Sequence, residues 1–515
     1  MHSCGTLLHI SSLPSRYGIG TLGKSAYNFI DFLNKSGQKY WQILPIGPTG
    51  YGDSPYQCYS AYAGNPLLID LEKLIEEKLI SEYDPDIKFL NKANGFDSYS
   101  KLFNIKNVVL HKACETFLST DNKKKLNTYI TFCNKNVDWL DNYALFMSLK
   151  YHFNQVMWLE WPDDIRLRKG EAIAEYSKTL EKEIEYWKFT QFKFFEQYNA
   201  LKNYANENNI LLFGDMPIYV SADSADIWAD PKLFMLDDNL KPIKVAGCPP
   251  DDYSPTGQLW GNPVYNWDAM KVDGYKWWIN RVAYSQKLFD LIRIDHFRGF
   301  ESYYSIPAKD KTAENGEWVK GPGYELFEAI KKELGDVNLV AEDLGFLTDS
   351  VKKMLKRTGF PGMKVLEFAF YDKDSTYLPH NYIQNTVAYI GTHDNDTTIG
   401  WYKTLDKKTK KFAKQYCRLS KSEGINWGLI RTLYSSVSDL VIVQMQDFLG
   451  LDSKSRMNTP STVGNGNWMW RMKESDMSLS LIKKIKKLAK LYSRSNPKKK
   501  AVSEEITETA EDLYK

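Results

Sequence analysis

Three short acidic stretches each close an apolar run: Leu291-Ile-Arg-Ile-Asp295-His296-Phe, Leu339-Val-Ala-Glu342-Asp343-Leu and Ala388-Tyr-Ile-Gly-Thr-His393-Asp394. A short apolar run is typical of a buried strand. In a parallel (β/α) barrel the carboxyl ends of all strands point into one cleft, so acids far apart in sequence meet there. Two or three carboxylates in a cleft of sugar size are the groups that cleave a glycosidic bond.

The three acids can be given different roles. Cleavage of an acetal with retention needs a carboxylate nucleophile and a carboxylic acid that protonates the leaving oxygen. We interpret Asp295 as the nucleophile, because Arg293 lies two residues earlier on the same strand face and its positive charge favours a carboxylate. Glu342 is the expected acid/base, since a second carboxylate nearby raises the pKa of a general acid. Asp394, with His393 beside it, would bind sugar hydroxyls and favour the distorted sugar ring.

Eight short β-rich runs pass through the chain, and most are bounded by Gly, Pro or Asn. Helical patterns separate the later runs, which favours a closed (β/α)8 TIM barrel of the α/β class over an open sheet. Asp343 follows Glu342 on one strand and is expected to point outward or to cap a helix. The runs are Gly5–Ile10, Tyr40–Ile46, Ile210–Ile218, Leu291–Phe297, Asn338–Leu344, Met363–Phe370, Thr386–Asp394 and Asp439–Asp447.

Two gaps between these runs are too long for a single crossover helix. We expect one barrel domain over residues 1–515, with a mainly helical insertion at 71–208 between the second and third strands. A loop-rich insertion is expected at 219–290, between the third and fourth strands, because its Pro, Gly, Asp and Trp content is typical of a long functional loop. Residues 496–515 have few large apolar side chains and are expected to form a flexible tail.

Composition argues against several partners. The net charge of +3 comes from 67 basic and 64 acidic residues mixed throughout, so we expect neither nucleic acid nor an anionic membrane as a partner. The basic amphipathic segment Leu481–Tyr492 is interpreted as a packed barrel helix. No apolar run approaches the roughly 18 residues of a membrane span and no signal peptide is seen, which fits a cytoplasmic enzyme. The six cysteines lack a CxxC pair, so we expect neither a zinc site nor a disulfide scaffold.

Other catalytic classes lack their motifs. The chain has no G-x-S-x-G elbow of a serine hydrolase and no glycine-rich phosphate loop. A metal hydrolase could use Asp295, His296, His393 and Asp394, but the chain has only seven histidines and no H-x-H or H-E-x-x-H spacing. We therefore expect no metal and no cofactor.

Longer motifs around these residues resemble the amylomaltases, also called disproportionating enzymes or 4-α-glucanotransferases, which share their barrel and catalytic arrangement with the α-amylases. The likeness runs from Gly5 to about Trp470. The motifs are Leu8-His-Ile-Ser-Ser-Leu-Pro-Ser-Arg-Tyr-Gly-Ile-Gly, Gln42-Ile-Leu-Pro-Ile-Gly-Pro-Thr-Gly-Tyr-Gly-Asp-Ser-Pro-Tyr56, Gly214-Asp-Met-Pro-Ile-Tyr-Val, the loop Pro249–Pro263, Arg293-Ile-Asp-His-Phe-Arg-Gly, Ala341-Glu-Asp-Leu-Gly, Gly391-Thr-His-Asp-Asn-Asp-Thr and Arg456-Met-Asn-Thr-Pro.

The resemblance implies the same three catalytic roles for Asp295, Glu342 and Asp394. It also implies that the loop Gly247–Gly261 folds over the substrate, with Gln258 and Trp260 on the acceptor side. The implied substrate-binding residues are Ser54, Tyr56, Asp215, Asp251, Gln258, Trp260, Arg293, His296, His393 and Asn458.

One departure from the family pattern lies in that loop. Where the family usually reads Pro-Pro-Asp-Tyr-Phe-Ser, this chain reads Pro249-Pro-Asp251-Asp252-Tyr253-Ser. Asp252 replaces an aromatic residue, which leaves stacking at the acceptor site and the preferred chain length open.

The expected function is 4-α-glucanotransfer, in which α-1,4-glucan segments from maltooligosaccharides, starch or glycogen move between chains by a retaining double displacement. The carboxylates alone leave a retaining α-glucan hydrolase as the alternative, because both reactions begin with the same glycosyl-enzyme. A glycan-binding barrel without catalysis is opposed by the three intact acids. The sequence does not predict an oligomeric state.

Overall fold

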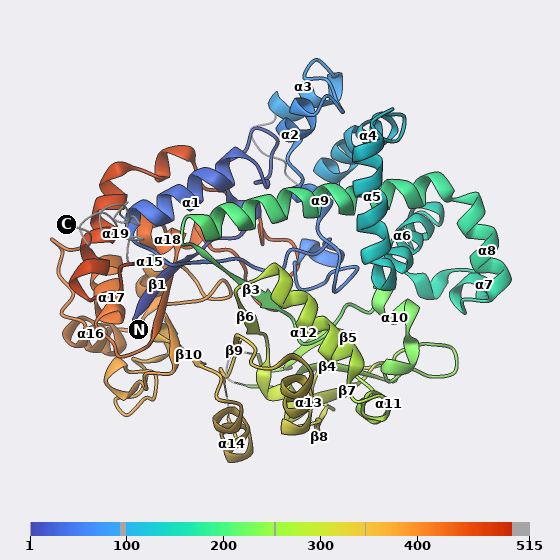
Figure 1. Cartoon of the computed structure of the whole chain (residues 1–515). Helices are drawn as coiled ribbons and strands as arrows, with labels where there is room; N and C mark the ends of the chain where they lie inside the picture. Colours follow the sequence, from blue (N-terminus) through green and yellow to red (C-terminus); the bar gives the residue numbers. More distant parts are fainter. Residues whose placement is uncertain (1, 93–98, 252–253, 346, 497–515) are drawn as a thin grey trace, which may run out of the picture.

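Eight parallel strands form the centre of the computed structural model, which describes residues 2–92, 99–251, 254–345 and 347–496 (Figure 1). Their order is β10-β11-β12-β1-β2-β3-β6-β9. The sheet curves into a barrel with helices around it, which confirms the predicted (β/α)8 fold. The strands are β1 (Ser3–Leu7), β2 (Tyr40–Gln42), β3 (Leu211–Met216), β6 (Leu291–Ile294), β9 (Leu339–Ala341), β10 (Gly362–Val365), β11 (Thr386–Tyr389) and β12 (Leu440–Gln444).

Each predicted run overlaps one of these strands, but the hydrogen-bonded strands are shorter. The run Leu291–Phe297, for example, contains β6 only over Leu291–Ile294. The backbone of His296 has a φ of 52°, in the left-handed region. Residues after Ile294 therefore turn out of the ladder, which leaves their side chains at the end of the barrel.

The barrel closes between β9 and β10 partly through a side chain. The backbone N–H of Ala341 donates to the carbonyl of Pro361 at 2.9 Å. Next to it, the backbone N–H of Met363 donates to the Asp343 carboxylate at 2.6 Å. Asp343 is buried, so the prediction that it points outward or caps a helix is wrong. Its carboxylate takes the place of a backbone carbonyl because the two strands have diverged here.

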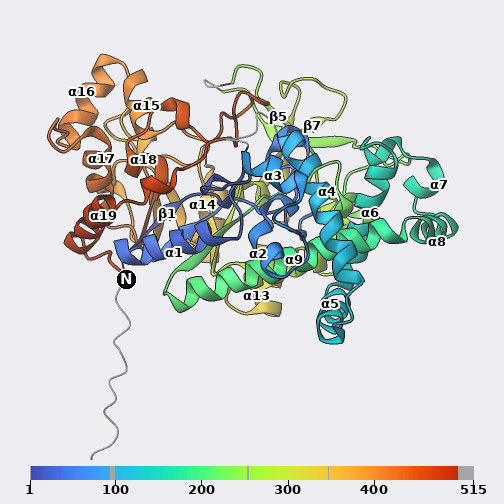
Figure 2. The ribbon, with the colours of Figure 1, turned by 90° about the horizontal axis from the view of Figure 1, so that it is seen from above.

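Helices cover the outside of the barrel, as Figures 1 and 2 show. The last of them, α19, packs against α1 and buries Ile485 and Ala489, which confirms that the basic amphipathic segment is a packed helix. The covering helices are α1 (Lys24–Ser36), α9 (Glu181–Glu207), α12 (Lys276–Leu288), α13 (Tyr324–Leu334), α14 (Asp349–Thr358), α15 (Thr398–Thr404), α16 (Lys407–Tyr416), α17 (Ile425–Tyr434), α18 (Met445–Leu449) and α19 (Leu479–Leu491).

A group of helices lies between β2 and β3, at one side of the barrel (Figure 1). It is joined to the barrel by α9, whose apolar side chains Trp187, Phe194, Tyr198 and Leu201 are buried. The other members are α2 (Leu71–Glu76), α3 (Pro85–Lys92), α4 (Tyr99–Leu118), α5 (Lys123–Lys135), α6 (Val137–His152), α7 (Asp163–Arg166) and α8 (Gly170–Thr179).

A second, antiparallel sheet of four strands stands beside the barrel, in the order β5-β4-β7-β8. Two of its strands and two short helices, α10 (Ala225–Ala229) and α11 (Trp267–Val272), lie in the segment expected to be rich in loops. Local sequence patterns did not reveal the sheet, because β4 pairs with β7 about sixty residues later. The strands are β4 (Lys244–Cys248), β5 (Gln258–Pro263), β7 (Ser302–Pro307) and β8 (Glu317–Lys320).

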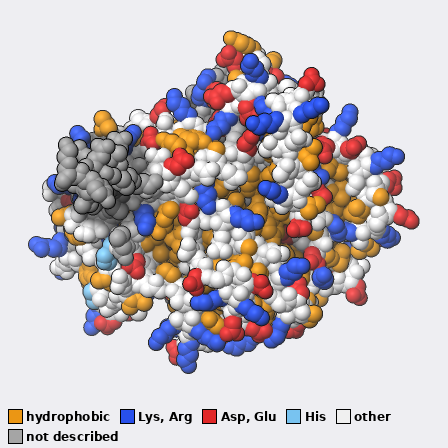
Figure 3. Space-filling model, in the orientation of Figure 1, with side chains coloured by type: hydrophobic (Ala, Val, Ile, Leu, Met, Phe, Trp, Pro, Cys, Tyr) orange, Lys and Arg blue, Asp and Glu red, His pale blue; other side chains and the backbone are white. Residues whose placement is uncertain are grey.

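Basic and acidic side chains are interspersed on the face shown in Figure 3. Among the helices in the described ranges, none combines the length and the apolar character needed to cross a membrane.

The role of Asp343 in barrel closure can be tested with Asp343→Leu, which keeps the number and branching of side-chain heavy atoms. We expect it to lower the free energy of unfolding by about 1–3 kcal/mol, because the buried N–H of Met363 loses its acceptor. Asp343→Asn retains an acceptor oxygen and should cost less. Denaturant unfolding of both variants measures the difference, and equal stabilities would contradict this account.

Candidate active site

One buried arginine joins two carboxylates at the ends of neighbouring strands. Arg293 on β6 and Asp215 on β3 are register partners. The Nη1 atom of Arg293 lies 2.8 and 2.7 Å from the two Asp215 oxygens, and Nη2 lies 2.8 Å from Oδ1 of Asp295. Burial alone would lower the pKa of Arg293, but the charges of Asp215 and Asp295 reverse this and raise it above its usual range. The Asp295 side chain is 29% exposed, so it faces the cleft while the arginine holds it from behind.

Glu342, just beyond β9, has a different environment. Its two carboxyl oxygens accept backbone N–H groups, Oε2 from His296 at 2.8 Å and Oε1 from Leu344 at 2.9 Å. Burial raises the pKa of Glu342 to about 7; the charge of Arg293 opposes this rise and that of Asp295 adds to it. At neutral pH a comparable share of this carboxyl is protonated and ionised, so it can both donate and accept a proton.

Tyr56, His393 and Asp394 form a hydrogen-bonded row. The Tyr56 hydroxyl donates to Asp215 at 2.8 Å and lies 2.8 Å from Nε2 of His393. The same Nε2 lies 3.2 Å from Oδ2 of Asp394. Because Tyr56 has one hydroxyl proton and Asp215 accepts it, Nε2 of His393 must carry the hydrogen that faces both Tyr56 and Asp394.

Asp394 is held as a carboxylate. Burial acts to raise its pKa, but the charge of His393 and hydrogen bonds from His393 and Asn458 outweigh it, and the pKa falls well below its usual range. The Asn458 amide donates to Oδ1 of Asp394 at 2.6 Å. Arg456 ties the two backbones together, donating to the carbonyl of Asp394 at 2.5 Å and to that of Asn458 at 2.6 Å.

The small antiparallel sheet supplies another part of the site. Gln258 and Trp260 alternate along β5 with Leu259, so both point to one face. The ring of Trp260 stands edge-on to that of His296 at 4.9 Å, and its Nε1 donates to the Gln258 side chain at 3.1 Å. Burial lowers the pKa of His296 to about 4, and its buried Nε2 has no hydrogen-bond partner among the described residues. The neutral imidazole ring of His296 therefore packs edge-on against Trp260 at this end of the site.

Two predicted substrate contacts lie in turns. Ser54 accepts the backbone N–H of Tyr56 at 3.2 Å, so it supports the segment that carries Tyr56. Asp251 is exposed and accepts the N–H of Ser254 at 2.7 Å. Asp252, the departure from the family pattern, lies outside the described residues.

Trp468 also belongs to the site, although the sequence around it does not indicate the end of a strand. It follows a run rich in glycine and asparagine, which is typical of turns. Its ring lies 6.0 Å from that of Tyr56 and 6.1 Å from that of His393. Only its distance from these residues in the folded chain identifies it.

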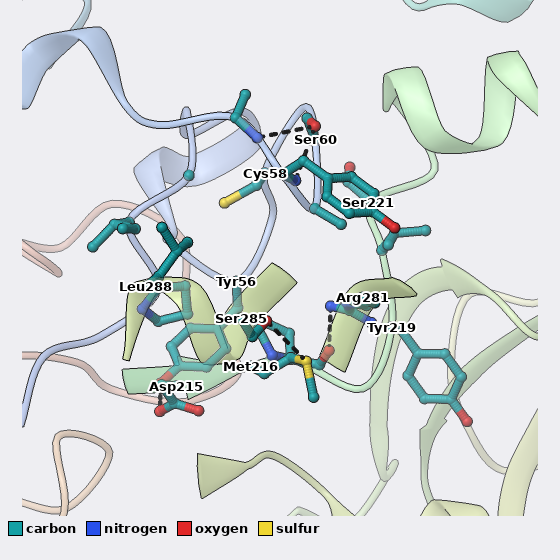
Figure 4. A pocket seen from close by; sticks show the side chains of 18 of the residues that line it. Tyr56, Cys58, Ser60, Asp215, Met216, Tyr219, Ser221, Arg281, Ser285 and Leu288 are labelled. Carbon is teal, nitrogen blue, oxygen red and sulfur yellow. Dashed lines mark hydrogen bonds between the residues drawn. The ribbon is translucent and has the colours of Figure 1, made fainter. Parts of the chain in front are cut away.

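Tyr56 and Asp215 also line a small cavity of about 60 Å³ (Figure 4). Arg281 lines it and donates to the carbonyl of Ile218 at 3.0 Å. The volume would hold about four water molecules, fewer heavy atoms than a sugar ring with its hydroxyls. The cavity is therefore too small to hold a sugar residue. Other lining residues are Cys58, Ser60, Ser221 and Ser285.

Among the described residues, no group of three or more His, Cys, Asp or Glu side chains is arranged to hold a metal ion. Asp215 and Asp295 instead bond to Arg293, and His393 contacts Asp394.

Known proteins resemble this chain in sequence along most of its length. The sequence model of the family described as 4-alpha-glucanotransferase matches residues 8–478. The chain belongs to this family. Among 4-alpha-glucanotransferases, that of Clostridium butyricum is 50% identical over 490 residues, covering 95% of this chain and all of the relative. That of Streptococcus pneumoniae is 49% identical over 496 residues, covering 96% of this chain and 97% of the relative.

Solved structures agree with the family assignment. The amylomaltase from Streptococcus agalactiae, in complex with acarbose, matches with a TM-score of 0.93 and 43% identity, covering 96% of this chain and all of that one. The amylomaltase from Corynebacterium glutamicum shares the fold at 18% identity, with a TM-score of 0.76 over 96% of this chain and 75% of that one.

The bridging arginine can be tested with Arg293→Lys. Lysine keeps the charge but is a single point that cannot bind Asp215 with one nitrogen and Asp295 with another. We expect glucan transfer to fall about 100-fold or more, because Asp295 loses its fixed orientation. The matched control is Arg431→Lys, which alters an arginine that grips Glu423 away from the cleft. Initial rates and melting curves compare the two, and near-normal activity of Arg293→Lys would contradict the assignment.

Proposed function

We propose that this protein transfers α-1,4-glucan segments between maltooligosaccharides by a retaining double displacement, with Asp295 as nucleophile, Glu342 as acid/base and Asp394 as stabiliser of the transition state. The observation that supports these roles is that two carboxyls of one cleft have different hydrogen-bond partners. Asp295 accepts a guanidinium hydrogen bond, whereas the hydrogen bonds that Glu342 accepts from described residues come from backbone N–H groups, and burial raises its pKa to about 7. A nucleophile must be ionised and a general acid must carry a proton.

In the first step, an Asp295 oxygen forms a bond to the anomeric carbon while the glycosidic bond breaks. Glu342 gives its proton to the departing oxygen, so the reducing-end segment leaves as a neutral alcohol. In the second step, Glu342 takes the proton of the acceptor hydroxyl, whose oxygen attacks the same carbon and releases Asp295. Two inversions give net retention, and both carboxyls return to their starting states.

The donor sugar is proposed to bind against the row of Tyr56, His393 and Asp394. Asp394 is a carboxylate at neutral pH, and its oxygens can accept sugar hydroxyls whose hydrogen bonds strengthen as positive charge develops on the ring. We assign further donor contacts to Arg293, Asp215, Ser54 and Asn458, which carry or orient this row.

The acceptor sugar is proposed to bind beside Trp260, Gln258 and His296, with Asp251 in the covering loop. The Trp260 ring offers an apolar face for stacking, and the His296 ring stands edge-on to it at 4.9 Å. A covered acceptor site excludes water from the glycosyl-enzyme, which favours transfer over hydrolysis.

The ligand and the cellular compartment are also part of the proposal. The Streptococcus agalactiae amylomaltase was solved with acarbose, and we propose that the corresponding cleft of this chain holds a maltooligosaccharide. We also propose a cytoplasmic location, because all six cysteines are free thiols, the state favoured in a reducing compartment.

Maltotriose tests the function directly. Incubated alone with the protein, it should yield glucose and a ladder of longer oligosaccharides while the number of reducing ends stays nearly constant, since each transfer breaks one glycosidic bond and forms another. Chromatography of the products and a reducing-sugar assay measure this. A steady rise in reducing ends without longer products would indicate the hydrolase instead.

The roles of the two carboxyls can be separated by pH and by leaving group. With maltotriose, kcat/KM should fall as pH rises through about 7, because Glu342 loses the proton that it must donate. Fluoride release from α-glucosyl fluoride needs no such proton, so its first turnover should lack this alkaline fall. Glu342→Gln should release fluoride but scarcely use maltotriose.

Asp295→Asn is the matched control for that experiment, since an amide cannot form the glycosyl ester. It should use neither maltotriose nor the fluoride. Fluoride release by Asp295→Asn and not by Glu342→Gln would reverse the two assignments.

A further inference from the structure

The Trp468 ring stands behind the Tyr56–His393 pair, but no regular secondary structure holds it there. Trp468 lies in an irregular segment between β12 and α19. Its side chain is buried, and its backbone N–H donates to the carbonyl of Met457 at 2.7 Å. The position of the ring therefore depends on the groups that grip its backbone.

The backbone of Trp468 is strained. Its φ is 64°, in the left-handed region that bulky residues rarely adopt and that costs free energy. Such a conformation persists only where neighbouring groups enforce it. The carbonyl of Trp468 accepts two hydrogen bonds, from the Tyr99 hydroxyl at 2.7 Å and from Nη1 of Arg471 at 2.9 Å.

These two donors also hold each other. Nη2 of Arg471 donates to the Tyr99 hydroxyl at 2.9 Å, so the hydroxyl, the guanidinium and the Trp468 carbonyl form a closed triangle. Tyr99 is only 6% exposed, and a buried hydroxyl with two partners has little freedom to move.

Tyr99 comes from a distant part of the chain. It is the first residue of α4, in the helical group between β2 and β3 (Figure 1), and precedes Trp468 by 369 residues. The hydroxyl therefore links this helical group to the wall of the cleft.

We propose that Tyr99 is a positioning residue for glucan transfer. Together with Arg471 it fixes the Trp468 carbonyl, and the Trp468 ring then keeps Tyr56 and His393 in place. His393 in turn retains its 3.2 Å contact with Asp394. This inference rests on the proposed roles of His393 and Asp394, and it gives the helical group a part in the reaction.

Tyr99→Phe tests the proposal, because it removes only the hydroxyl. We expect kcat for maltotriose to fall about 10- to 100-fold with little change in KM, since His393 and Asp394 act mainly in the transition state. The matched control is Tyr129→Phe: Tyr129 is 5% exposed in the same helical group, and its hydroxyl donates to Glu185 at 2.7 Å, within that group. All rates are measured at a temperature where circular dichroism shows each variant folded.

A double-mutant cycle with Trp468→Ala tests whether Tyr99 acts through Trp468. If Tyr99 acts through Trp468, Tyr99→Phe should have almost no further effect on kcat in the Trp468→Ala background. A full additional loss there would overturn the proposal, as would a Tyr99→Phe variant whose kcat stays within about twofold of the Tyr129→Phe control. If Tyr99→Phe does not fold at any assay temperature, Arg471→Lys takes its place with the same expected and opposing results.

The same assays separate this inference from the proposed function. Absence of transfer by the unaltered protein would contradict the proposed function. Normal transfer by both the unaltered protein and the Tyr99→Phe variant would contradict only the positioning role of Tyr99.

Discussion

The site depends on a buried positive charge. Arg293 can remain among the strand ends only because Asp215 and Asp295 both face it, since an unpaired ion in the interior costs several kcal/mol. Its planar fork also fixes the distance and orientation of the two carboxylates. The same contacts join β3 to β6, so one interaction stabilises the barrel and orients the proposed nucleophile. Loss of the guanidinium would leave the buried carboxylate of Asp215 without its counterion.

The two carboxyls of the proposed reaction differ because of this arginine. Asp295 receives its direct hydrogen bond, while Glu342 feels its charge from further away and is held by the N–H groups of His296 and Leu344. The left-handed backbone of His296 thus serves two ends of the cleft. Its N–H orients Glu342, and its imidazole stands against Trp260. A single residue therefore contacts both the proposed acid, Glu342, and the tryptophan of the proposed acceptor site.

Much of the barrel could be predicted from the sequence, because its strands are short apolar runs whose burial is a local signal. The positions of Asp295, Glu342 and Asp394 beyond the ends of strands were predictable for the same reason, since each follows such a run. The small sheet was not, because β4 and β7 find each other only in the folded chain. Asp343 was misjudged because alternation along a strand does not reveal that a carboxylate can replace a backbone carbonyl. Trp468 was missed because its neighbours in sequence indicate only turns.

The length of α9 has a mechanical consequence. Its 27 residues span about 40 Å at 1.5 Å per residue, and only residues 208–210 separate its end from β3. A continuous helix of this length, packed along its buried apolar side, is expected to move as a rigid unit. If a glucan or another protein displaced the outlying helices, α9 would transmit the displacement to β3. Asp215 lies on β3, so its ion pair with Arg293 would be affected.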